Sequence, residues 1–379
     1  MSKKKVNPLL RALLLKPISW VFGAVTYVRN KMFDSGMLEQ RSFDIPVLVV
    51  GNIAVGGTGK TPHTEYLVNL LHTRYNIGVL SRGYNRRTRG FVLATDHTGA
   101  REIGDEPYQI YRKFGKDVMV AVCEDRCQGI DRMRELNPDI NLIILDDAFQ
   151  HRFVKPTASI VLTEHAYPIF EDHLLPDGRL RESPRALHRA DIVIVTKCPD
   201  EMPPLDYRLF TKNLHLFPYQ KLFFTKYAYG APLPVFSTEG AADKTPPVLS
   251  ALNDHDTIMA LAGVANPRPF VKHLRKYRAK VRGLVFPDHH NFGVEDIRLL
   301  ISRIKATTSP ERVIVVTTEE DAMRLRAVSS IPKWLKSRMY YIPVTVQFIP
   351  NPSEENTTGA GSFAKALLEL LSTCRPKQK

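Results

Sequence analysis

Glycines, a lysine and a threonine gather between residues 51 and 62, where the sequence reads GNIAVGGTGKTP. They follow an apolar run and precede a predicted helix, which is the setting of a phosphate-binding loop. Glycines let backbone N–H groups face a polyphosphate, the lysine reaches its outer oxygens, and the threonine hydroxyl can bind Mg²⁺. The strict pattern needs a glycine where this chain has Ala54, so the match depends on order and context. The expected nucleotide-binding residues are Gly56, Gly57, Thr58, Gly59, Lys60 and Thr61.

A pair of aspartates offers the carboxylates that such a loop needs. The segment NLIILDDAFQHR (141–152) runs through apolar residues into Asp146 and Asp147. A carboxylate at the end of a neighbouring strand holds Mg²⁺ directly or through water. Alone, two aspartates after an apolar run could equally begin a turn. Beside the phosphate-binding loop they predict a site for ATP or GTP with Mg²⁺, in which Thr61 is the third metal ligand.

Three further kinds of polar segment could serve the phosphoryl acceptor. Residues 81–90 (SRGYNRRTRG) contain four arginines and no acid, which suits phosphate groups but is also typical of a solvated loop. In GDEP (104–107), Asp105 could be a general base, or it could cap a helix. The loops LLPDGRLRESP (174–184) and PDHHNF (287–292) offer arginine, acid and histidine side chains without identifying a function.

Composition limits the classes of protein and of partner. The chain has 379 residues, 44% hydrophobic and 24% charged, which argues against a peptide module and against a mainly disordered chain. The formal net charge is +14, so we expect an anionic partner: nucleic acid, acidic lipid or a phosphorylated substrate. Four irregularly spaced cysteines favour a reducing compartment over a disulfide framework.

The elements that must position these residues begin with six runs rich in valine, isoleucine and leucine. Continuous apolar character without alternation predicts strands buried on both faces of a parallel sheet. Amphipathic stretches such as 62–75 and 126–136 separate several of the runs. This is the pattern of a doubly wound α/β domain, whose ligands bind at the carboxyl ends of the strands. The expected strands are 46–51, 77–81, 117–122, 141–147, 159–163 and 191–197.

A second α/β set follows a proline-rich break at 199–204. Between the two sets, 221–229 is predicted to be an exposed strand of alternating aromatic and polar residues. We expect 345–350 to pair with it because both lie at the edges of the second set, and the helix 362–371 to return to the first domain. The second set is predicted to contain strands 257–264, 280–286, 312–318 and 339–344, with helices near 269–277 and 294–305.

The first 31 residues contain seven lysines or arginines and no acid. The charge-free stretch 17–28 has 12 residues, whereas a spanning helix needs about 20, so no transmembrane helix is predicted. A secretory signal is not favoured either, because no small-residue cleavage site follows. Two alternatives stay open: a helix in a membrane interface, with Trp20, Phe22 and Val25 at the acyl boundary, or a helix docked on the protein's own core.

Together these segments resemble the tetraacyldisaccharide 4′-kinase (lipid A 4′-kinase) family. The resemblance extends over essentially the whole chain, and LDDAFQHR and LLPDGRLRE are its most specific parts. The other matching segments, in the family's order, are VGNIAVGGTGKTP, SRGY, GDEP, TK (196–197), AGVANPRPF (262–270), FPDHHNF and TTEEDAMRL (317–325).

The resemblance implies a fold and an activity. It implies two α/β/α domains of the Rossmann-like, P-loop NTPase type, joined by a two-stranded β linker, with an N-terminal amphipathic helix. The reaction implied is transfer of the ATP γ-phosphate, with Mg²⁺, to the 4′-hydroxyl of tetraacyldisaccharide 1-phosphate, giving lipid IVA. We accordingly expect an N-terminal membrane-associating helix (1–34), a kinase core (35–218), a linker strand (219–231), a second α/β domain (232–343), and a return strand with a C-terminal helix (344–379).

The resemblance also implies roles for residues at matching positions. The catalytic base falls on Asp105, its histidine partner on His289, and the phosphate-loop lysine on Lys60. One departure is visible, because the family's T-E-K-D-A reads T-E-E-D-A here, which removes the lysine at position 320 and puts its nucleotide contact in doubt. The expected acceptor-binding residues are Arg82, Tyr84, Arg126, Arg181 and Glu182.

The expected partners are the lipid substrate and a membrane surface, at the cytoplasmic face of the inner membrane. Neither an obligate protein partner nor nucleic acid is expected, since no known nucleic-acid module appears. The alternative is a phosphate-loop ATPase or GTPase that acts on a protein or metal cargo. A basic nucleic-acid binding protein is a further competing hypothesis, and it predicts salt-sensitive binding.

Overall fold

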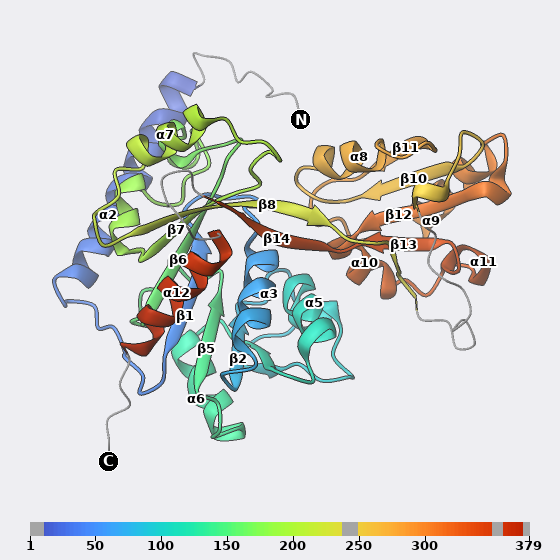
Figure 1. Cartoon of the computed structure of the whole chain (residues 1–379). Helices are drawn as coiled ribbons and strands as arrows, with labels where there is room; N and C mark the ends of the chain where they lie inside the picture. Colours follow the sequence, from blue (N-terminus) through green and yellow to red (C-terminus); the bar gives the residue numbers. More distant parts are fainter. Residues whose placement is uncertain (1–10, 237–248, 351–358, 374–379) are drawn as a thin grey trace.

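The computed structural model describes residues 11–236, 249–350 and 359–373. Parts of three expected segments therefore lie outside the described residues: 1–10 of the N-terminal helix, 237–248 of the second domain, and 351–358 and 374–379 of the C-terminal segment. Two sheets organise the chain and lie side by side (Figure 1).

The larger sheet has nine strands in the described residues, in the order β14-β8-β7-β6-β1-β5-β2-β4-β3. All neighbouring pairs are parallel except the two at the edges, β14 with β8 and β3 with β4. The inner strands are fully buried, as their continuous apolar sequence predicts. Their bounds are β1 Val47–Asn52, β2 Ile77–Ser81, β3 Val92–Leu93, β4 Met119–Val122, β5 Leu142–Asp146, β6 Ala158–Glu164, β7 Ile192–Thr196, β8 Lys221–Tyr229 and β14 Val344–Ile349.

Helices cover both faces of this sheet. Leu67, Ile110 and Phe363, from α3, α5 and α12, pack on one face. Ile130 and Phe210, from α6 and α7, pack on the other. The result is an α/β/α sandwich with two apolar layers. The helices are α3 Lys60–Leu71, α4 Ala100–Ile103, α5 Asp105–Phe114, α6 Arg126–Leu136, α7 Pro204–Asn213 and α12 Gly359–Ser372, with 3₁₀ turns Ile169–Glu171 (η2) and Pro184–Arg189 (η3).

The smaller sheet, in the order β11-β10-β12-β13-β9, forms the second domain. Phe270 of α8 packs on one face, whereas Leu300 of α9, Met323 of α10 and Leu335 of α11 pack on the other. Its elements are β9 Leu233–Pro234, η4 Leu249–Ala251, β10 Thr257–Ala262, α8 Arg268–Leu274, β11 Lys280–Val285, α9 Val294–Lys305, η5 Pro310–Arg312, β12 Val313–Thr318, α10 Glu319–Arg326, α11 Lys333–Lys336 and β13 Met339–Ile342.

The two strands that connect the domains, β8 and β14, pair as expected but belong to the first sheet. β8 lies parallel to β7 with Ile192 opposite Lys221, and β14 runs antiparallel to β8. Our placement of this pair at the edge of the second set was wrong. The middle of β8, Phe223 to Thr225, is buried rather than exposed, because α12 covers Phe223 on one face of the sheet and α7 covers Phe224 on the other. The chain crosses between the domains where Gly230 N–H donates to the carbonyl of Pro343.

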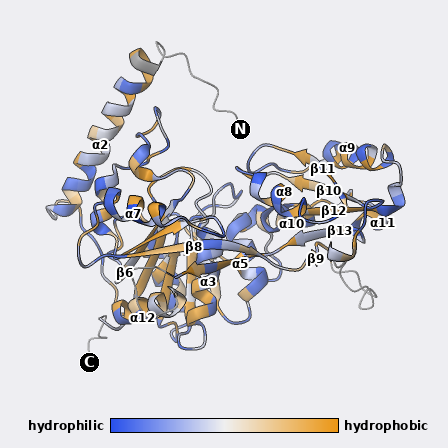
Figure 2. Ribbon diagram, turned by 45° about the horizontal axis from the view of Figure 1, so that its top comes forward, coloured by the Kyte–Doolittle hydropathy of each residue, from blue (hydrophilic) through white to orange (hydrophobic). Residues whose placement is uncertain are grey.

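The N-terminal helix α2 (Lys16–Asp34), preceded by a π-helical turn η1 (Arg11–Leu15), lies along the first domain (Figure 1). Its carboxyl end is docked: Phe33 is buried against Phe153, and Asp34 pairs with Arg152. Its amino-terminal half leaves large apolar side chains exposed, as the mixed colours of α2 in Figure 2 illustrate. Trp20 is 75% exposed. No helix in the described part of the chain has both the length and the apolar character needed to cross a membrane.

Candidate active site

The phosphate-binding loop connects β1 to α3, as the sequence predicts. Gly56 and Gly59 have φ values of +112° and +92°, which L side chains rarely adopt. A Cβ at Gly59 would also lie 2.3 Å from the hydroxyl oxygen of Tyr227. Only glycine therefore fits at Gly59. The Asn52 amide also donates to the hydroxyl of Thr58 over 2.8 Å, which ties the loop back to the strand that precedes it.

Lys60 and Thr61 begin α3 directly after this loop. Lys60 Nζ lies 3.7 Å from Oδ1 of Asp147, the second aspartate after β5. Asp147 itself adopts a left-handed backbone conformation, with φ of +48°. The structure thus brings the predicted lysine and the predicted carboxylates to one point at the carboxyl edge of the sheet.

Asp146 ends β5 with a fully buried side chain. Its Oδ1 accepts a hydrogen bond from the hydroxyl of Thr64 over 2.9 Å, whereas Oδ2 has no hydrogen-bond partner among the described residues. Burial and the neighbouring Asp147 raise the pKa of Asp146 to about 6. A buried carboxylate oxygen without a partner beside a second carboxylate and a threonine suits a hard divalent cation, so these residues fit Mg²⁺.

Glu106, the second residue of α5, joins this group of charges. Burial, followed by the charge of Asp146, raises its pKa to about 8, and Lys60 acts in the opposite direction. Glu106 thus lies in the electrostatic field of the loop lysine and of the aspartate pair. A cation bound there would favour the ionised forms of Asp146 and Glu106.

The carboxyl end of β7 supports the phosphate-binding loop from its other side. The hydroxyl of Thr196 donates to the carbonyl of Thr58 over 2.8 Å, and Nζ of Lys197 donates to the carbonyl of Gly57. Lys197 has a positive φ of 55° and also pairs with Glu164. The Thr-Lys pair after β7 therefore fixes the loop's backbone, a role that the sequence alone did not assign.

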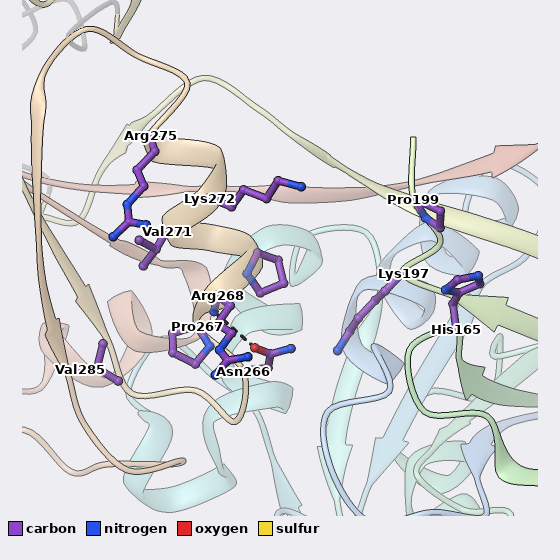
Figure 3. A pocket seen from close by; sticks show the side chains of 11 residues that line it. His165, Lys197, Pro199, Asn266, Pro267, Arg268, Val271, Lys272, Arg275 and Val285 are labelled. Carbon is purple, nitrogen blue, oxygen red and sulfur yellow. Dashed lines mark hydrogen bonds between the residues drawn. The ribbon is translucent and has the colours of Figure 1, made fainter. Parts of the chain in front are cut away.

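A cleft of about 830 Å³ opens beside Lys197, between the two domains (Figure 3). Lys197 and His165 line it from the first domain, and the beginning of α8 with the preceding loop lines it from the second. Several of its side chains are cationic. The lining from the second domain is Asn266, Pro267, Arg268, Pro269, Val271, Lys272, Arg275 and Val285.

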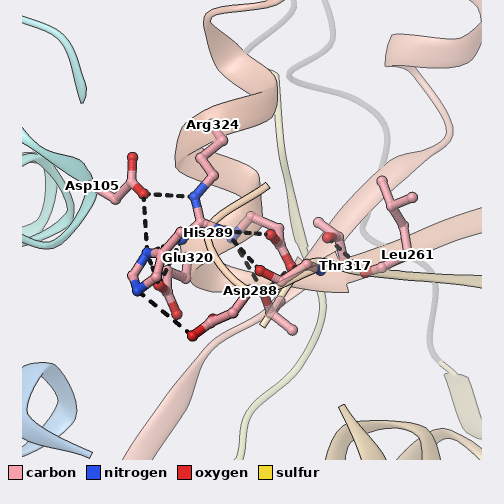
Figure 4. Close-up of polar contacts among 10 residues, drawn as sticks. Asp105, Leu261, Asp288, His289, Thr317, Glu320 and Arg324 are labelled. Carbon is pink, nitrogen blue, oxygen red and sulfur yellow. Dashed lines mark hydrogen bonds and ion pairs between the residues drawn. The ribbon is translucent and has the colours of Figure 1, made fainter. Parts of the chain in front are cut away.

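Asp105 and His289 meet across the domain interface, as the resemblance implied. Asp105 is the first residue of α5, and His289 lies in the loop after β11. Oδ2 of Asp105 and Nδ1 of His289 are 3.8 Å apart. The guanidinium of Arg324, from α10, lies beside this pair and contacts both members, as Figure 4 shows. Arg324 Nε donates to Oδ2 of Asp105 over 2.6 Å, and Nη2 approaches Nδ1 of His289 at 3.0 Å.

The pKa values of the two residues shift in opposite directions. Burial pushes the pKa of Asp105 upward, but the hydrogen bond with His289 and the charge of Arg324 outweigh it, so the pKa is lowered. The pKa of His289 is raised, first by hydrogen bonding with Asp105 and further by Glu320 and Asp288. Asp105 is therefore kept ionised, which is the form that can accept a proton.

Position 320, where the sequence departs from the family's lysine, faces this cluster. Oε1 of Glu320 accepts a hydrogen bond from Nη2 of Arg324 over 2.7 Å and lies 3.5 Å from Nδ1 of His289. The side chain is therefore paired with an arginine of its own helix. Arg324, which lies in the matching segment 317–325 but was assigned no role there, contacts both members of the predicted pair.

A second ionic cluster joins the domains about two turns further along α5. Lys113 Nζ lies 2.6 Å from a carboxylate oxygen of Glu65 on α3 and 2.6 Å from one of Glu319 on α10. The amide of Gln109 also donates to Glu65. Because α5 contacts α10 along its length, its N-terminal Asp105 is held against the second domain.

The residues expected to bind the acceptor lie in three different environments. Arg82 and Tyr84 are exposed, and the Tyr84 ring lies 5.5 Å from that of His289. Arg126 is buried at the start of α6, where it donates to the carbonyls of Cys123 and Glu124 while its Nε has no partner among the described residues.

Arg181 and Glu182 follow the loop 174–180 and face different ways. Arg181 Nη1 lies 3.4 Å from Oδ1 of Asp147, so it belongs to the site. Glu182 is only 4% exposed and binds Asn30 of α2 and Arg189 instead. The carboxylate of Glu182 already fastens the loop to α2. This arrangement therefore does not support a contact between Glu182 and the substrate.

The sequence of this chain is similar to known proteins over most of its length. The family model described as tetraacyldisaccharide-1-P 4′-kinase matches residues 11–358. The chain belongs to the tetraacyldisaccharide 4′-kinase family. A relative from Bacteroides thetaiotaomicron named tetraacyldisaccharide 4′-kinase is 47% identical over 345 residues, which cover 90% of each chain. One of the same name from Bacteroides fragilis is 46% identical over 341 residues, again 90% of each.

A solved structure shares the fold of this family member. It is a crystal structure of LpxK from Aquifex aeolicus, described as an apo form in complex with ATP. The two chains are 24% identical, the TM-score is 0.69, and the match covers 96% of this chain and 99% of that one. The predicted fold class, two α/β/α domains of the P-loop kinase type, is confirmed by this likeness and by the two sheets.

Proposed function

We propose that this chain transfers the γ-phosphate of ATP to the 4′-hydroxyl of tetraacyldisaccharide 1-phosphate, a step in lipid A biosynthesis. The observation that carries the proposal is the meeting of the loop residue Lys60 with Asp147, and of Asp105 with His289, at one edge of the first sheet. The first pair suits the phosphate donor, and the second suits an alcohol acceptor. Relatives that bear this enzyme's name at 46–47% identity support the choice of substrate.

The donor would bind along the phosphate-binding loop. Backbone N–H groups of residues 56–61 would hold the phosphates, and Lys60 would neutralise charge on the transferring group. The cationic cleft beside Lys197 has a volume of about 830 Å³, which is room for the nucleoside. It adjoins the phosphate-binding loop, because Lys197 donates to the carbonyl of Gly57. Thr61, Asp146 and Asp147 would hold Mg²⁺, which supplies positive charge to the phosphate oxygens.

The acceptor would enter from the side of Asp105. A sugar hydroxyl is a poor nucleophile at neutral pH, so a carboxylate within hydrogen-bond reach should take its proton as the new bond to phosphorus forms. Asp105 is ionised and has the imidazole of His289 beside it. Arg82, Arg126 and Arg181 are the cations that could bind the anionic head group.

We further propose that the exposed face of α2 places the enzyme on a membrane. The large apolar side chains of its amino-terminal half have no core to pack on, and basic residues accompany them. A second cleft, of about 370 Å³, lies between this helix and the loop 172–184. An acyl chain could pass from the membrane along this surface. We therefore propose a peripheral enzyme at the cytoplasmic face of the inner membrane, and the absence of an obligate protein partner stays a prediction. The segments predicted for it are a membrane-associating helix, a kinase core, a two-stranded linker and a second domain.

A transfer assay tests the proposal. The full chain is incubated with γ-labelled ATP, Mg²⁺ and tetraacyldisaccharide 1-phosphate in detergent micelles, and label in the lipid fraction is counted. We expect label in the lipid, with little release of free phosphate when the acceptor is left out. Hydrolysis that is indifferent to the lipid would instead indicate a phosphate-loop ATPase with another cargo, and salt-sensitive retention on DNA or RNA would indicate a nucleic-acid binding protein.

A further inference from the structure

The guanidinium of Arg324 makes hydrogen bonds to groups of both domains. Its side chain is only 3% exposed. All three of its nitrogens donate. Nε bonds Asp105, Nη2 bonds Glu320 and His289, and Nη1 bonds Asp321 and the carbonyl of Gly263 at 2.8 and 3.0 Å. A planar fork of five N–H groups can satisfy such a set at once, whereas an ammonium cannot.

The contact with Asp105 uses only one oxygen of the carboxylate. The contacts of Asp105 with Arg324 and with His289 both involve Oδ2. None of the described residues donates a hydrogen bond to Oδ1. A carboxylate held in this way keeps one oxygen for the proton of an incoming hydroxyl, and its plane is fixed by the arginine. Figure 4 shows both interactions meeting at a single oxygen of Asp105.

The contact with His289 determines which nitrogen of the ring carries hydrogen. A guanidinium N–H can only donate, so Nδ1 must accept, and the neutral ring then carries its hydrogen on Nε2. If His289 gains a proton at Nδ1, that N–H faces the carboxylates of Asp105 and Glu320, at 3.8 and 3.5 Å. Arg324 thus contacts both groups between which a proton would pass, the Nδ1 of the ring and the carboxylate of Asp105.

The remaining acids hold the arginine itself. Glu320 and Asp321, on the same helix, bind Nη2 and Nη1, and Asp321 also accepts from the backbone N–H of Gly263. The charged groups that face His289 are therefore Asp105 from α5, Glu320 and Arg324 from α10, and Asp288 from its own loop. One buried cation balances several carboxylates in this small volume.

We propose that Arg324, held by Glu320, is the positioning residue that sets the geometry of Asp105 and His289 across the domain interface. This inference rests on the function proposed above. Arg324 does not touch the reacting atoms; it keeps the carboxylate of Asp105 ionised with Oδ1 free, and it orients the imidazole. The second domain thereby controls the base of the first.

The experiment compares Arg324→Gln and Arg324→Lys with wild type in the lipid transfer assay, over a range of pH. Without the guanidinium, kcat should fall about 10- to 100-fold while KM for ATP changes little, because a charge-assisted contact to the base is lost. The acid limb of the pH profile should move upward in Arg324→Gln, since the pKa of Asp105 loses a lowering influence. Arg324→Lys should lower kcat but leave that limb near its wild-type position, because the charge is kept.

Arg326 provides a matched control on the same helix. Its Nε donates to the carbonyl of Val235, within the second domain, and it contacts neither Asp105 nor His289. Arg326→Gln and Arg326→Lys should leave kcat and the pH profile unchanged. A purely structural role for arginines of α10 would make both positions behave alike. If Arg324→Gln does not fold, Arg324→Lys and Glu320→Gln carry the test.

A titration of the His289 ring by NMR, assigned with His289→Gln, gives a readout that does not depend on activity. Loss of Arg324 should raise the midpoint of His289, and Glu320→Gln should lower it, because these two charges act on the ring in opposite directions. Unmoved midpoints, or wild-type kcat in both Arg324 variants, would overturn the inference. A wild-type enzyme that labels no lipid would instead refute the proposed function, and the titration would still decide whether Arg324 governs the pair.

Discussion

Nδ1 of His289, in the second domain, lies 3.8 Å from Oδ2 of Asp105, at the start of α5 in the first. Neither domain alone contains both groups. The pair exists because α5 packs along α10. Further along α5, Lys113 pairs with Glu319 of α10 and holds the two helices together. A base assembled in this way is in place only when the domains meet, which would limit the loss of ATP to water.

Replacing the two members of this pair separately and together should show whether they act as a unit. Asp105→Ala and His289→Ala should each lower kcat strongly with little change in ATP affinity. The double variant should be scarcely slower than the slower single variant. Steady-state kinetics with saturating lipid measure this. Losses that multiply in the double variant would indicate two independent roles, and His290→Ala, whose ring binds Asp296 instead, is the control.

Removal of the loop lysine should nearly abolish transfer. Lys60→Ala should lower kcat at least about 100-fold, because a preorganised cation at the transferring phosphoryl group is lost. The variant should keep its melting temperature, since Nζ of Lys60 pairs only with Asp147, at 3.7 Å, in the described residues. Lys212→Ala, on the exposed surface of α7, serves as the control. A Lys60→Ala enzyme with more than about a tenth of the wild-type rate would refute the assignment.

The backbone of the loop can be tested at Gly59. Gly59→Ala combines a positive φ with a Cβ placed 2.3 Å from the Tyr227 hydroxyl, so the loop must shift. We expect ATP affinity to fall about tenfold or more, which corresponds to about 1.4 kcal/mol of binding free energy. Gly36→Ala has a similar φ of +77° but no atom within 4 Å. Calorimetric titration with ATP should detect the loss in the first variant only; equal affinities would show that Gly59 does not shape the site.

The proposed membrane face of α2 predicts a charge-sensitive association. Trp20→Glu and Val25→Glu should weaken binding to vesicles that contain anionic lipid, because both side chains are more than half exposed and would no longer enter the acyl boundary. The melting temperature should change little. Leu136→Glu, at an exposed position of α6, should bind as wild type does. Vesicle co-sedimentation makes the comparison, and undiminished binding of both α2 variants would place the membrane contact elsewhere.

Local patterns were sufficient to predict the elements of the fold. Buried strands such as β1 and β5 are apolar up to the polar residue at their carboxyl end, and this signal lies within the segment itself. The position of a strand at a sheet edge is different, because it depends on the neighbour it pairs with. The alternation in 221–229 predicted a strand correctly, but nothing in those residues indicated that β8 pairs with β7.

The residues of the site also differ in whether a local pattern predicts them. Lys60, Thr61, Asp146 and Asp147 follow from spacing, because each lies at a strand end or helix start that the pattern predicts. Asp105 with His289 needed the family resemblance, since their segments come from different domains. Arg324 lies in the matching segment 317–325 but was assigned no role, because an arginine on a short amphipathic helix has the same pattern whether it is solvated or buried among carboxylates. The contacts of Glu182 with Asn30 and Arg189 could not be predicted for the same reason, and its contact with the acceptor stays a prediction.

The position of the new phosphate tests the proposed reaction most directly. Lipid recovered after incubation of the full chain with ATP, Mg²⁺ and tetraacyldisaccharide 1-phosphate can be analysed by ³¹P–¹H correlation NMR. The account predicts a second phosphate monoester whose phosphorus couples to the proton at carbon 4 of the distal glucosamine, and its absence when Asp105→Ala replaces wild type. A phosphate attached to any other hydroxyl, or an unmodified lipid beside free phosphate, would contradict it.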